Sequence, residues 1–441
     1  MPEIKGFRAW RYNKEKVKRF SEVLAPPYDV ISKKEQEELH RGSAHNVVRL
    51  ILGKEARGDS TGNNKYTRAG EFFENWRSSK VLFQDASPAI YVYVQDYKEN
   101  RKPQRRIGFI AAMKLDERAV LRHENTLAAP KEDRMALIKE VRANLSPIFG
   151  LFEDKSGVVQ KILNRIVGAG LPAGQAGSLR PAIDAAIEGV RHRLFVEQRS
   201  DVLAAIVKAM RLKPVFIADG HHRFEVACQY KKWMKSQVKL SGRWSATKAS
   251  ADQSANVPLA DWNYVMTYFS DCLHNPFTIY PTHRLIRVKK NAGAPLELLK
   301  QKGALKKFKT LPNILHDLSK TRLADPNKNY RFGVYTKKDG FSILTLDKKR
   351  APSKSAKISD RLDVAMLHRA IIEKPEAIDF TRDAAAAVKE VKKGKFDLAI
   401  FLRPTSLKEV VDVSKKGLKM PQKSTYFYPK LLSGLVFHRF E

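Results

Sequence analysis

The stretch KPVFIADGHHRFEVACQ, residues 213–229, joins a short apolar run, a tight turn and an amphipathic run. The apolar run PVFIA is typical of a buried strand. Asp219 and Gly220 supply the turn, because glycine adopts a positive φ without a steric penalty. Three apolar residues recur on one face of the helix expected after the turn: Phe224, Ala227 and Cys228. The stretch therefore predicts a strand, a turn and a helix whose first turn contains His221 and Arg223.

The start of this helix is a candidate anion site. The first amides of a helix have no partner within it, and the helix dipole favours negative charge there. Arg223 adds a planar cation suited to phosphate. The residues that we expect to bind phosphate here are Gly220, His221, His222 and Arg223. Asp219 is expected either to cap the helix or to orient a substrate hydroxyl or a metal ion.

The composition indicates a folded protein of two or three domains. The chain has 441 residues, 43% of them hydrophobic, and no run of 18 apolar residues. A membrane span is therefore not expected, and the absence of an apolar segment near the N-terminus favours the cytoplasm. The two cysteines, Cys228 and Cys272, lack the spacing of a zinc or redox motif.

The net charge is strongly positive. Lys and Arg number 82 against 47 Asp and Glu, which gives +35. Such a charge attracts polyanions such as nucleotides or nucleic acid. The densest basic segments are residues 16–19, 287–290, 302–309 and 348–357. No aromatic RNA-binding motif accompanies them, so a solvated basic surface and non-specific polyanion binding both remain open.

Alternating strand and helix patterns predict an α+β (mixed α/β) fold. Strands are expected at residues 46–52, 89–97, 105–115, 146–154, 192–198, 262–270 and 282–289. Helices are expected through EFFENWRSS (residues 71–79), at residues 134–145 and at residues 200–212. A loop is expected at residues 237–259. The patterns suggest an N-terminal domain over residues 1–290 and a C-terminal α/β domain over 291–441.

Several sequence blocks resemble a known family, domain of unknown function 1015. The blocks keep their order along nearly the whole chain: residues 24–32, 123–138, 143–154, 218–227, 263–269, 281–286 and 420–437. The segment FIADGHHRFEVA is also similar to a phosphate-binding motif of the ParB/sulfiredoxin superfamily. This resemblance implies a ParB/sulfiredoxin-like N-terminal core with elaborations that binds a nucleotide.

Relatives with a similar DGHHR turn are free-serine kinases, which phosphorylate the hydroxyl of L-serine with ADP or ATP. The resemblance implies Mg²⁺ with the nucleotide, and catalytic roles for Asp219, His221 and His222. In those relatives a glutamate in a His-Glu pair is thought to be the base. His123 and Glu124 are similar but lie much farther upstream of the turn than in those kinases. Glu124 is the candidate base, and His123 a candidate pocket residue.

Further candidates lie in three segments. In PKEDR, Lys131 and Arg134 are candidate phosphate ligands and Asp133 a candidate magnesium ligand, although acidic residues here equally suit a helix cap. Candidate pocket residues elsewhere are Asp29, His283, Arg284, Lys423, Ser424 and Thr425. The segment KSTYFYPK, in which Lys423 and Lys430 bracket three aromatic residues, suits either a pocket wall or a C-terminal core anchor.

The leading hypothesis is a small-molecule kinase whose substrates are a nucleotide and a small hydroxyl compound such as serine. A ParB-like, nucleotide-responsive DNA-binding protein is one alternative, although we find no convincing helix-turn-helix segment. A nucleotide hydrolase using the same turn is another. The oligomeric state is not indicated by the sequence.

Overall fold

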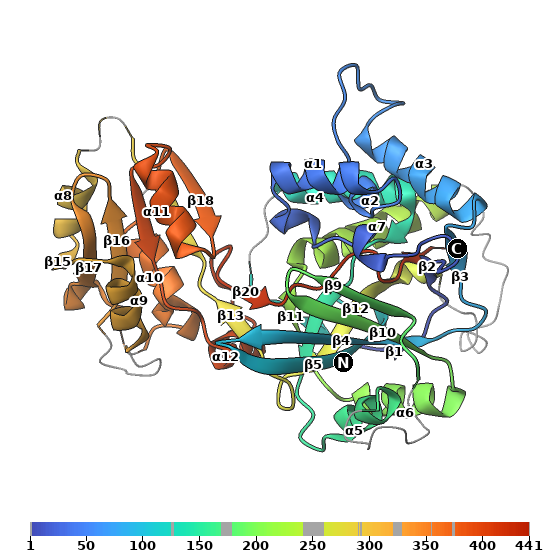
Figure 1. Cartoon of the computed structure of the whole chain (residues 1–441). Coiled ribbons are helices and arrows are strands. Elements are labelled where there is room, and N and C mark those ends of the chain that lie inside the picture. Colours follow the sequence, from blue (N-terminus) through green and yellow to red (C-terminus); the bar gives the residue numbers. More distant parts are fainter. Residues whose placement is uncertain are drawn as a thin grey trace. The chain divides into compact units, whose positions relative to one another are not determined.

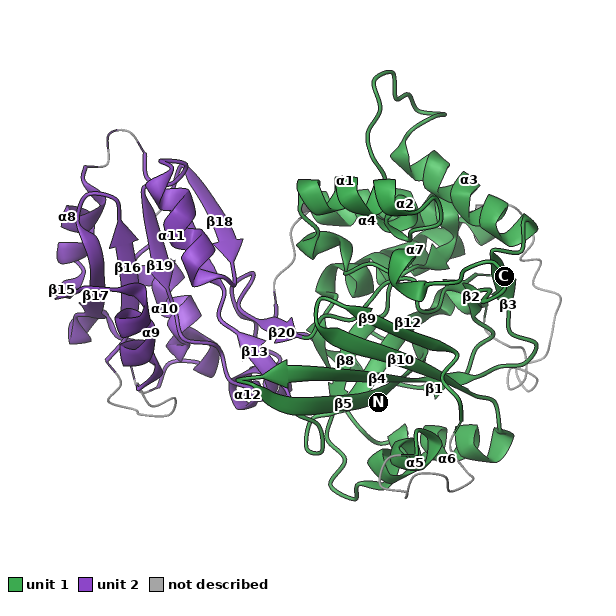
Figure 2. Ribbon diagram, viewed as in Figure 1, with its two compact units in different colours: residues 1–121, 126–276, 429–441 green, residues 122–125, 277–428 purple. Residues whose placement is uncertain are grey.

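A computed structural model describes residues 2–124, 128–168, 179–240, 260–289, 291, 293–320, 329–353, 355–372 and 375–440. The chain divides into two compact units, coloured separately in Figure 2. Unit 1 comprises residues 1–121, 126–276 and 429–441, and unit 2 comprises residues 122–125 and 277–428. Helices and strands occur in both units (Figure 1), as expected for the predicted α+β class.

Unit 1 is built on a mixed nine-stranded sheet. Its strand order is β6-β11-β8-β12-β5-β4-β10-β9, and β1 pairs with β5. The strands are β1 (Ile4–Lys5), β4 (Ile90–Glu99), β5 (Lys102–Lys114), β6 (Val120–Leu121), β8 (Ile148–Phe152), β9 (Ile183–Ile187), β10 (Val190–Glu197), β11 (Val215–Asp219) and β12 (Tyr264–Asp271). The long β4–β5 pair is an antiparallel hairpin formed by the two strands expected at residues 89–97 and 105–115.

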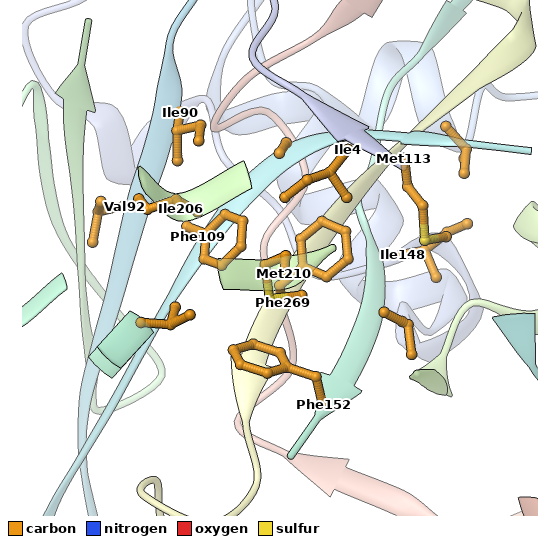
Figure 3. Packing of buried hydrophobic residues seen from close by; sticks show 14 of the residues in the cluster. Ile4, Ile90, Val92, Phe109, Met113, Ile148, Phe152, Ile206, Met210 and Phe269 are labelled. Atoms are coloured by element: carbon orange, nitrogen blue, oxygen red, sulfur yellow. The ribbon is translucent and has the colours of Figure 1, made fainter. Parts of the chain in front are cut away.

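One face of this sheet carries the main hydrophobic core. Helices α5 (Val158–Ile166) and α6 (Ser200–Met210) lie on this side of the sheet in Figure 1. They contribute Leu163 and Ile206 to a cluster that includes Phe109 and Phe269, whose rings stack with centroids 5.1 Å apart (Figure 3). Alternate residues of β5 enter this cluster because strand side chains point to opposite faces.

The remaining helices of unit 1 are α1 (Lys33–Gly42), α2 (Val48–Ile51), α3 (Lys65–Ser78), α4 (Ala128–Val141) and α7 (His221–Leu240). Ile138 of α4 packs against Val226 and Tyr230 of α7. Two small ribbons complete the unit, β2 (Trp10–Tyr12) with β3 (Leu82–Gln84), and β7 (Ala143–Asn144) with β21 (His438–Arg439). The second ribbon joins the C-terminal segment to unit 1 through antiparallel pairing.

Unit 2 has a six-stranded sheet with helices on both faces. The strand order is β15-β17-β16-β19-β14-β18. The strands are β14 (His283–Arg287), β15 (Gly303–Phe308), β16 (Arg331–Thr336), β17 (Gly340–Leu346), β18 (Ala377–Thr381) and β19 (Leu398–Phe401). Its helices are α8 (Pro295–Lys300), α9 (Leu311–Ser319), α10 (Asp363–Ala370), α11 (Ala384–Lys392) and α12 (Leu407–Lys415). A separate ribbon pairs β13 (Thr278–Tyr280) with β20 (Tyr426–Tyr428).

Two hydrophobic clusters hold the layers of unit 2 together. Leu299 of α8 and Leu367 of α10 pack against one face of the sheet. Ile314 of α9 and Val388 of α11 pack against the other. Consecutive residues of a strand serve opposite clusters, as expected for a sheet that is buried on both faces. Unit 2 is therefore a sandwich in which helices cover both faces of an antiparallel sheet.

The predicted strand at residues 46–52 is wrong. Residues Val48–Ile51 form helix α2, and the side chain of Asn46 accepts a hydrogen bond from the Val48 amide at 2.9 Å. A short apolar run does not distinguish a strand from a buried helical turn. Helix α4 begins at Ala128, before the predicted residue 134. The predicted loop at 237–259 begins as the last turn of α7, and residues 241–259 lie outside the described part of the chain.

The division into units differs from the predicted boundary at residue 290. The main segment of unit 2 begins at Phe277, and residues Arg122–Asn125 also belong to unit 2. Residues Pro429–Glu441 belong to unit 1 because the C-terminal segment pairs with β7 and makes two backbone hydrogen bonds between Trp10 and Phe437. Such long-range pairing has no local signature in the sequence. Among the described residues, no helix is both long enough and apolar enough to cross a membrane.

We predict that Phe109→Ala lowers the free energy of unfolding by about 3–5 kcal/mol, because it removes a fully buried ring from the core of unit 1. Leu212→Ala is the matched control, since Leu212 is 78% exposed. Urea denaturation of both variants measures the difference. Equal effects of the two substitutions would contradict the packing described for β5.

Candidate functional site

The turn at residues 219–223 has the geometry that its sequence predicts. Strand β11 ends at Asp219, Gly220 has φ +92°, and the 20-residue helix α7 begins at His221. A Cβ on Gly220 would lie 3.0 Å from the guanidinium of Arg223. The backbone angle therefore favours glycine here, and a Cβ would require the guanidinium of Arg223 to shift by a few tenths of an ångström.

Asp219 lies between two cations of unit 1. One carboxylate oxygen is 3.4 Å from Nη2 of Arg223, and the other is 3.4 Å from Nζ of Lys430. Arg223 also donates through Nη1 to the carbonyl of Pro147. The three side chains are between 12% and 21% exposed. The turn thus gathers two positive charges around a partly exposed carboxylate at the start of a helix.

The C-terminal segment brings Lys430 to this turn. Gln95 Nε2 donates to the carbonyl of Lys430 at 2.9 Å, and the buried Arg106 donates to the carbonyl of Pro429. Arg106 also donates to Oε1 of Gln95 at 3.1 Å, and its guanidinium lies 4.8 Å from the centroid of the Phe149 ring. The backbone on which Lys430 sits is therefore fixed to strands β4 and β5.

Lys430 was not among the predicted site residues. Its only signal was its place beside three aromatic residues in KSTYFYPK. That pattern carried no indication of Asp219, which is remote in the sequence. Only the tertiary structure shows that Lys430 and Arg223 form a cation group around Asp219.

A small cavity adjoins Arg223. It has a volume of about 60 Å³ and is lined mainly by apolar residues of unit 1, together with Tyr28, Arg134 and Ser146. This volume is too small for a nucleotide. A base and ribose would therefore not fit in this cavity.

The PKEDR segment is helical and its charges are paired within unit 1. Lys131 lies 3.4 Å from Glu225, and Arg134 donates to the carbonyl of Ile51 at 2.7 Å. Asp133 accepts from the Tyr66 hydroxyl at 2.8 Å and also contacts Lys65 and Arg134. Burial raises the pKa of Asp133, but Arg134, Tyr66 and Lys65 outweigh burial and hold the pKa below its usual value.

The contacts of Asp133 and Asp219 do not fit the predicted role of these residues as magnesium ligands. The oxygens of Asp133 face a hydroxyl and two cations, and those of Asp219 face Arg223 and Lys430. A divalent cation would have to displace positive groups from either carboxylate. Asp29 is exposed, in a 3₁₀ turn at Tyr28–Val30.

The candidate base belongs to unit 2, whereas the turn at 219–223 belongs to unit 1. Oε1 of Glu124 accepts a hydrogen bond from the Lys423 amide at 3.0 Å. The buried His123 accepts from the Met420 amide through its carbonyl at 2.6 Å. Lys423 has φ +52°, an unusual angle for a residue with a side chain. Glu124 is thus held by the same segment that contains Ser424 and Thr425.

Three other predicted residues are buried in unit 2. The fully buried Arg284 donates to the carbonyls of Lys423 and Thr282, and burial lowers its pKa to about 9, against the opposing effect of Glu124. His283 accepts from the Leu402 amide at 3.4 Å. Ser424 is buried and donates to the carbonyl of Pro421. These side chains hold backbone in place, which is a structural role.

Comparisons with known proteins identify a family and several structures with low similarity. A family model described as a protein of unknown function (DUF1015) matches residues 4–365. No curated protein matches the chain. A free serine kinase variant in complex with AMP has 13% identity and a TM-score of 0.33, covering 72% of this chain and 87% of the kinase.

Two further structures have comparable scores. A conserved hypothetical protein from Pyrococcus furiosus has 14% identity and a TM-score of 0.34, covering 73% of this chain and 92% of its own. SbnI from Staphylococcus aureus, truncated at its C-terminus, has 13% identity and a TM-score of 0.34. The match covers 74% of this chain and 86% of SbnI.

We predict that the free energy of unfolding decreases as the pH is lowered, because His283 is buried in its neutral form. Burial, with a smaller effect of Arg284, lowers its pKa to about 4 in the folded chain, against about 6.5 when unfolded. Between pH 6.5 and 4 the unfolded chain therefore binds a proton that the folded chain does not. We expect the free energy of unfolding to fall by roughly 1–3 kcal/mol from this residue.

Urea denaturation at pH 7, 5.5 and 4.5 measures this effect. His283→Asn is the control, because it keeps an acceptor for the Leu402 amide but does not titrate. We expect a shallower pH dependence for the variant. Parallel curves for the two proteins would show that His283 does not carry the effect.

Proposed function

The chain belongs to the DUF1015 family, and we propose that this member transfers a phosphoryl group from an adenine nucleotide to the hydroxyl of a small molecule. The proposed donor is ADP or ATP, and the proposed acceptor is free L-serine or a similar hydroxyl compound. The family description assigns no function, so the proposal depends on the residues of this chain.

The arrangement of Asp219, Arg223 and Lys430 carries the proposal. Phosphoryl transfer requires little covalent assistance from the protein, but it does require positioned phosphates and neutralised charge. Arg223 and Lys430 supply two cations at the start of α7, where the helix dipole adds to their effect. Both ion pairs to Asp219 are 3.4 Å long, so a phosphate group with more negative charge competes well for the two cations.

Each residue of the turn has a proposed role. Arg223 binds two phosphate oxygens through its planar guanidinium, and Lys430 acts as a second, more mobile positive charge. His221 and His222 donate hydrogen bonds to phosphate oxygens. Gly220 leaves room for Arg223 at the turn. Asp219 holds the cations before the nucleotide binds and then orients the acceptor hydroxyl.

Glu124 of unit 2 is the proposed general base. The acceptor oxygen attacks the terminal phosphorus, and the bond from that phosphorus to the bridging oxygen of the nucleotide breaks. The hydroxyl proton passes to Glu124, and the nucleotide leaves with one phosphate fewer. The hydrogen bond from the Lys423 amide to Oε1 fixes the position of the Glu124 carboxylate.

Magnesium has no assigned protein ligand in this proposal. The carboxylates of Asp133 and Asp219 already face cations, as described above, and do not fit an incoming divalent ion. Magnesium is supplied in the assay with the nucleotide, as is usual for nucleotide substrates.

Product analysis distinguishes the proposal from its alternatives. Incubation with L-serine, Mg²⁺ and ATP or ADP should yield O-phosphoserine and the shortened nucleotide in equal amounts. Inorganic phosphate without phosphoserine would instead identify a nucleotide hydrolase. Neither product, together with sequence-dependent DNA binding that persists at raised salt, would favour the DNA-binding alternative.

We predict that Arg223→Ala weakens nucleotide binding by about 10- to 100-fold, because hydrogen bonds to charged groups contribute about 1.5–3 kcal/mol. Lys430→Met should weaken binding in the same direction. Isothermal titration with ADP measures the affinity, and Lys232→Ala, which removes an exposed lysine of α7, is the control. Unchanged affinity in both site variants would remove the phosphate site from the proposal.

We predict that Glu124→Gln lowers the turnover number by about 10²- to 10⁴-fold, the usual contribution of a general base. The amide oxygen of Gln can still accept from the Lys423 amide, so the local fold should be kept. Nucleotide affinity should not change. Wild-type turnover in this variant would show that another group takes the proton.

A further inference from the structure

Three tyrosines of unit 2 lie on one face of the β13–β20 ribbon. Tyr280 at the end of β13 pairs with Tyr426 on β20, and Tyr428 follows two residues later on the same side. The rings of Tyr280 and Tyr428 have centroids 5.2 Å apart. Phe427, which points to the opposite face, is only 1% exposed. The ribbon therefore has one buried side and one partly exposed aromatic side.

The guanidinium of Arg382 lies on these tyrosines. Its central carbon is 4.9 Å from the ring centroid of Tyr426, 5.5 Å from that of Tyr428 and 5.9 Å from that of Tyr280. Arg382 is exposed and follows directly after β18. Among the described residues, no carboxylate or carbonyl accepts a hydrogen bond from it. The rings therefore orient the guanidinium while its N–H donors stay available.

Arg284 provides a contrast within the same unit. It is fully buried, and its donors are used by the carbonyls of Thr282, Gln422 and Lys423. Arg284 therefore fixes backbone, whereas Arg382 presents its donors to solvent. An arginine held by ring faces loses little conformational freedom when an anion binds, which favours affinity.

The chain segment that leads into β20 also contains Lys423, whose amide donates a hydrogen bond to the proposed base, Glu124. Lys423, whose amide binds Glu124, lies three residues before Tyr426. A group that binds the acceptor next to this segment would serve the same reaction step as Glu124. A planar guanidinium binds carboxylate, as it binds phosphate, through two parallel hydrogen bonds. Hydroxy acids such as serine contain a carboxylate.

We propose that Arg382 binds the carboxylate of the acceptor, so that the acceptor class is a small hydroxylated carboxylic acid. This inference rests on the proposed function. The three tyrosines hold Arg382 in the orientation that receives the carboxylate. Arg382 thereby selects acids from among small alcohols, while phosphate binding is left to Arg223 and Lys430.

The test compares L-serine with ethanolamine, which has the hydroxyl and the amine but no carboxylate. Phosphorylation of each acceptor is measured for the wild-type protein, Arg382→Ala and Arg382→Lys. Lys389→Ala is the control, because it removes an exposed cation of α11 in the same unit. We expect Arg382→Ala to raise the KM for serine by about 10- to 100-fold and to leave ADP affinity unchanged.

The lysine variant sharpens this test. It keeps the charge but loses the planar fork, so we expect an intermediate KM. Wild-type protein should prefer serine to ethanolamine, and Arg382→Ala should lose most of that preference. Equal use of the two acceptors by the wild type, or an unchanged KM in Arg382→Ala, would overturn the carboxylate assignment and leave the kinase proposal intact.

A binding measurement keeps the assignment testable if no acceptor is phosphorylated, which would count against the proposed function. Saturation-transfer NMR with L-serine and ethanolamine reports binding without catalysis. Serine signals that are present with wild-type protein and absent with Arg382→Ala support the site. Equal serine signals from both proteins, or none from the wild type, overturn it.

Discussion

The arrangement of unit 1 depends on the contacts that the buried guanidinium of Arg106 makes with its neighbours. A charge that is fully removed from water requires close partners. Arg106 meets this requirement through Gln95 on β4, the carbonyl of Pro429 and the ring of Phe149. Because one partner lies on the C-terminal segment, the central sheet and the end of the chain must be assembled together. Lys430 is positioned next to Asp219 as a consequence of that requirement.

The cation group at Asp219 differs from Arg106 in its exposure. Its three side chains retain between 12% and 21% of their accessible surface, so water and salt weaken their attraction. We do not attribute much of the stability of the fold to these ion pairs. The Asp219 carboxylate keeps the two cations in position through ion pairs of 3.4 Å, which a bound anion can replace. This property is useful where an anionic ligand must compete for the same cations.

Local patterns were sufficient for much of the fold. The strand, the turn at Gly220 and the helix at His221 follow from residues 213–229, because their apolar spacing and glycine specify each part. The two strands of the β4–β5 hairpin and the alternating elements of unit 2 were predicted from apolar spacing for the same reason. The prediction was wrong at residues 46–52, where the run is short enough to fit either a strand or a buried turn. Charged residues were harder to interpret, since Asp133 is held by Tyr66 and Lys65, both remote from it in sequence.

The sequence by itself determined the fold class, the geometry of the turn at 219–223 and the placement of Arg223 at a helix start. These depend on neighbours within a few residues, where steric and hydrogen-bonding preferences act directly. Only the tertiary structure decided that the C-terminal segment belongs to unit 1, that Lys430 shares Asp219 with Arg223, and that Arg382 rests on three tyrosines. Each of these contacts joins residues far apart in the chain, and folding selects them through the combined burial and pairing of whole elements.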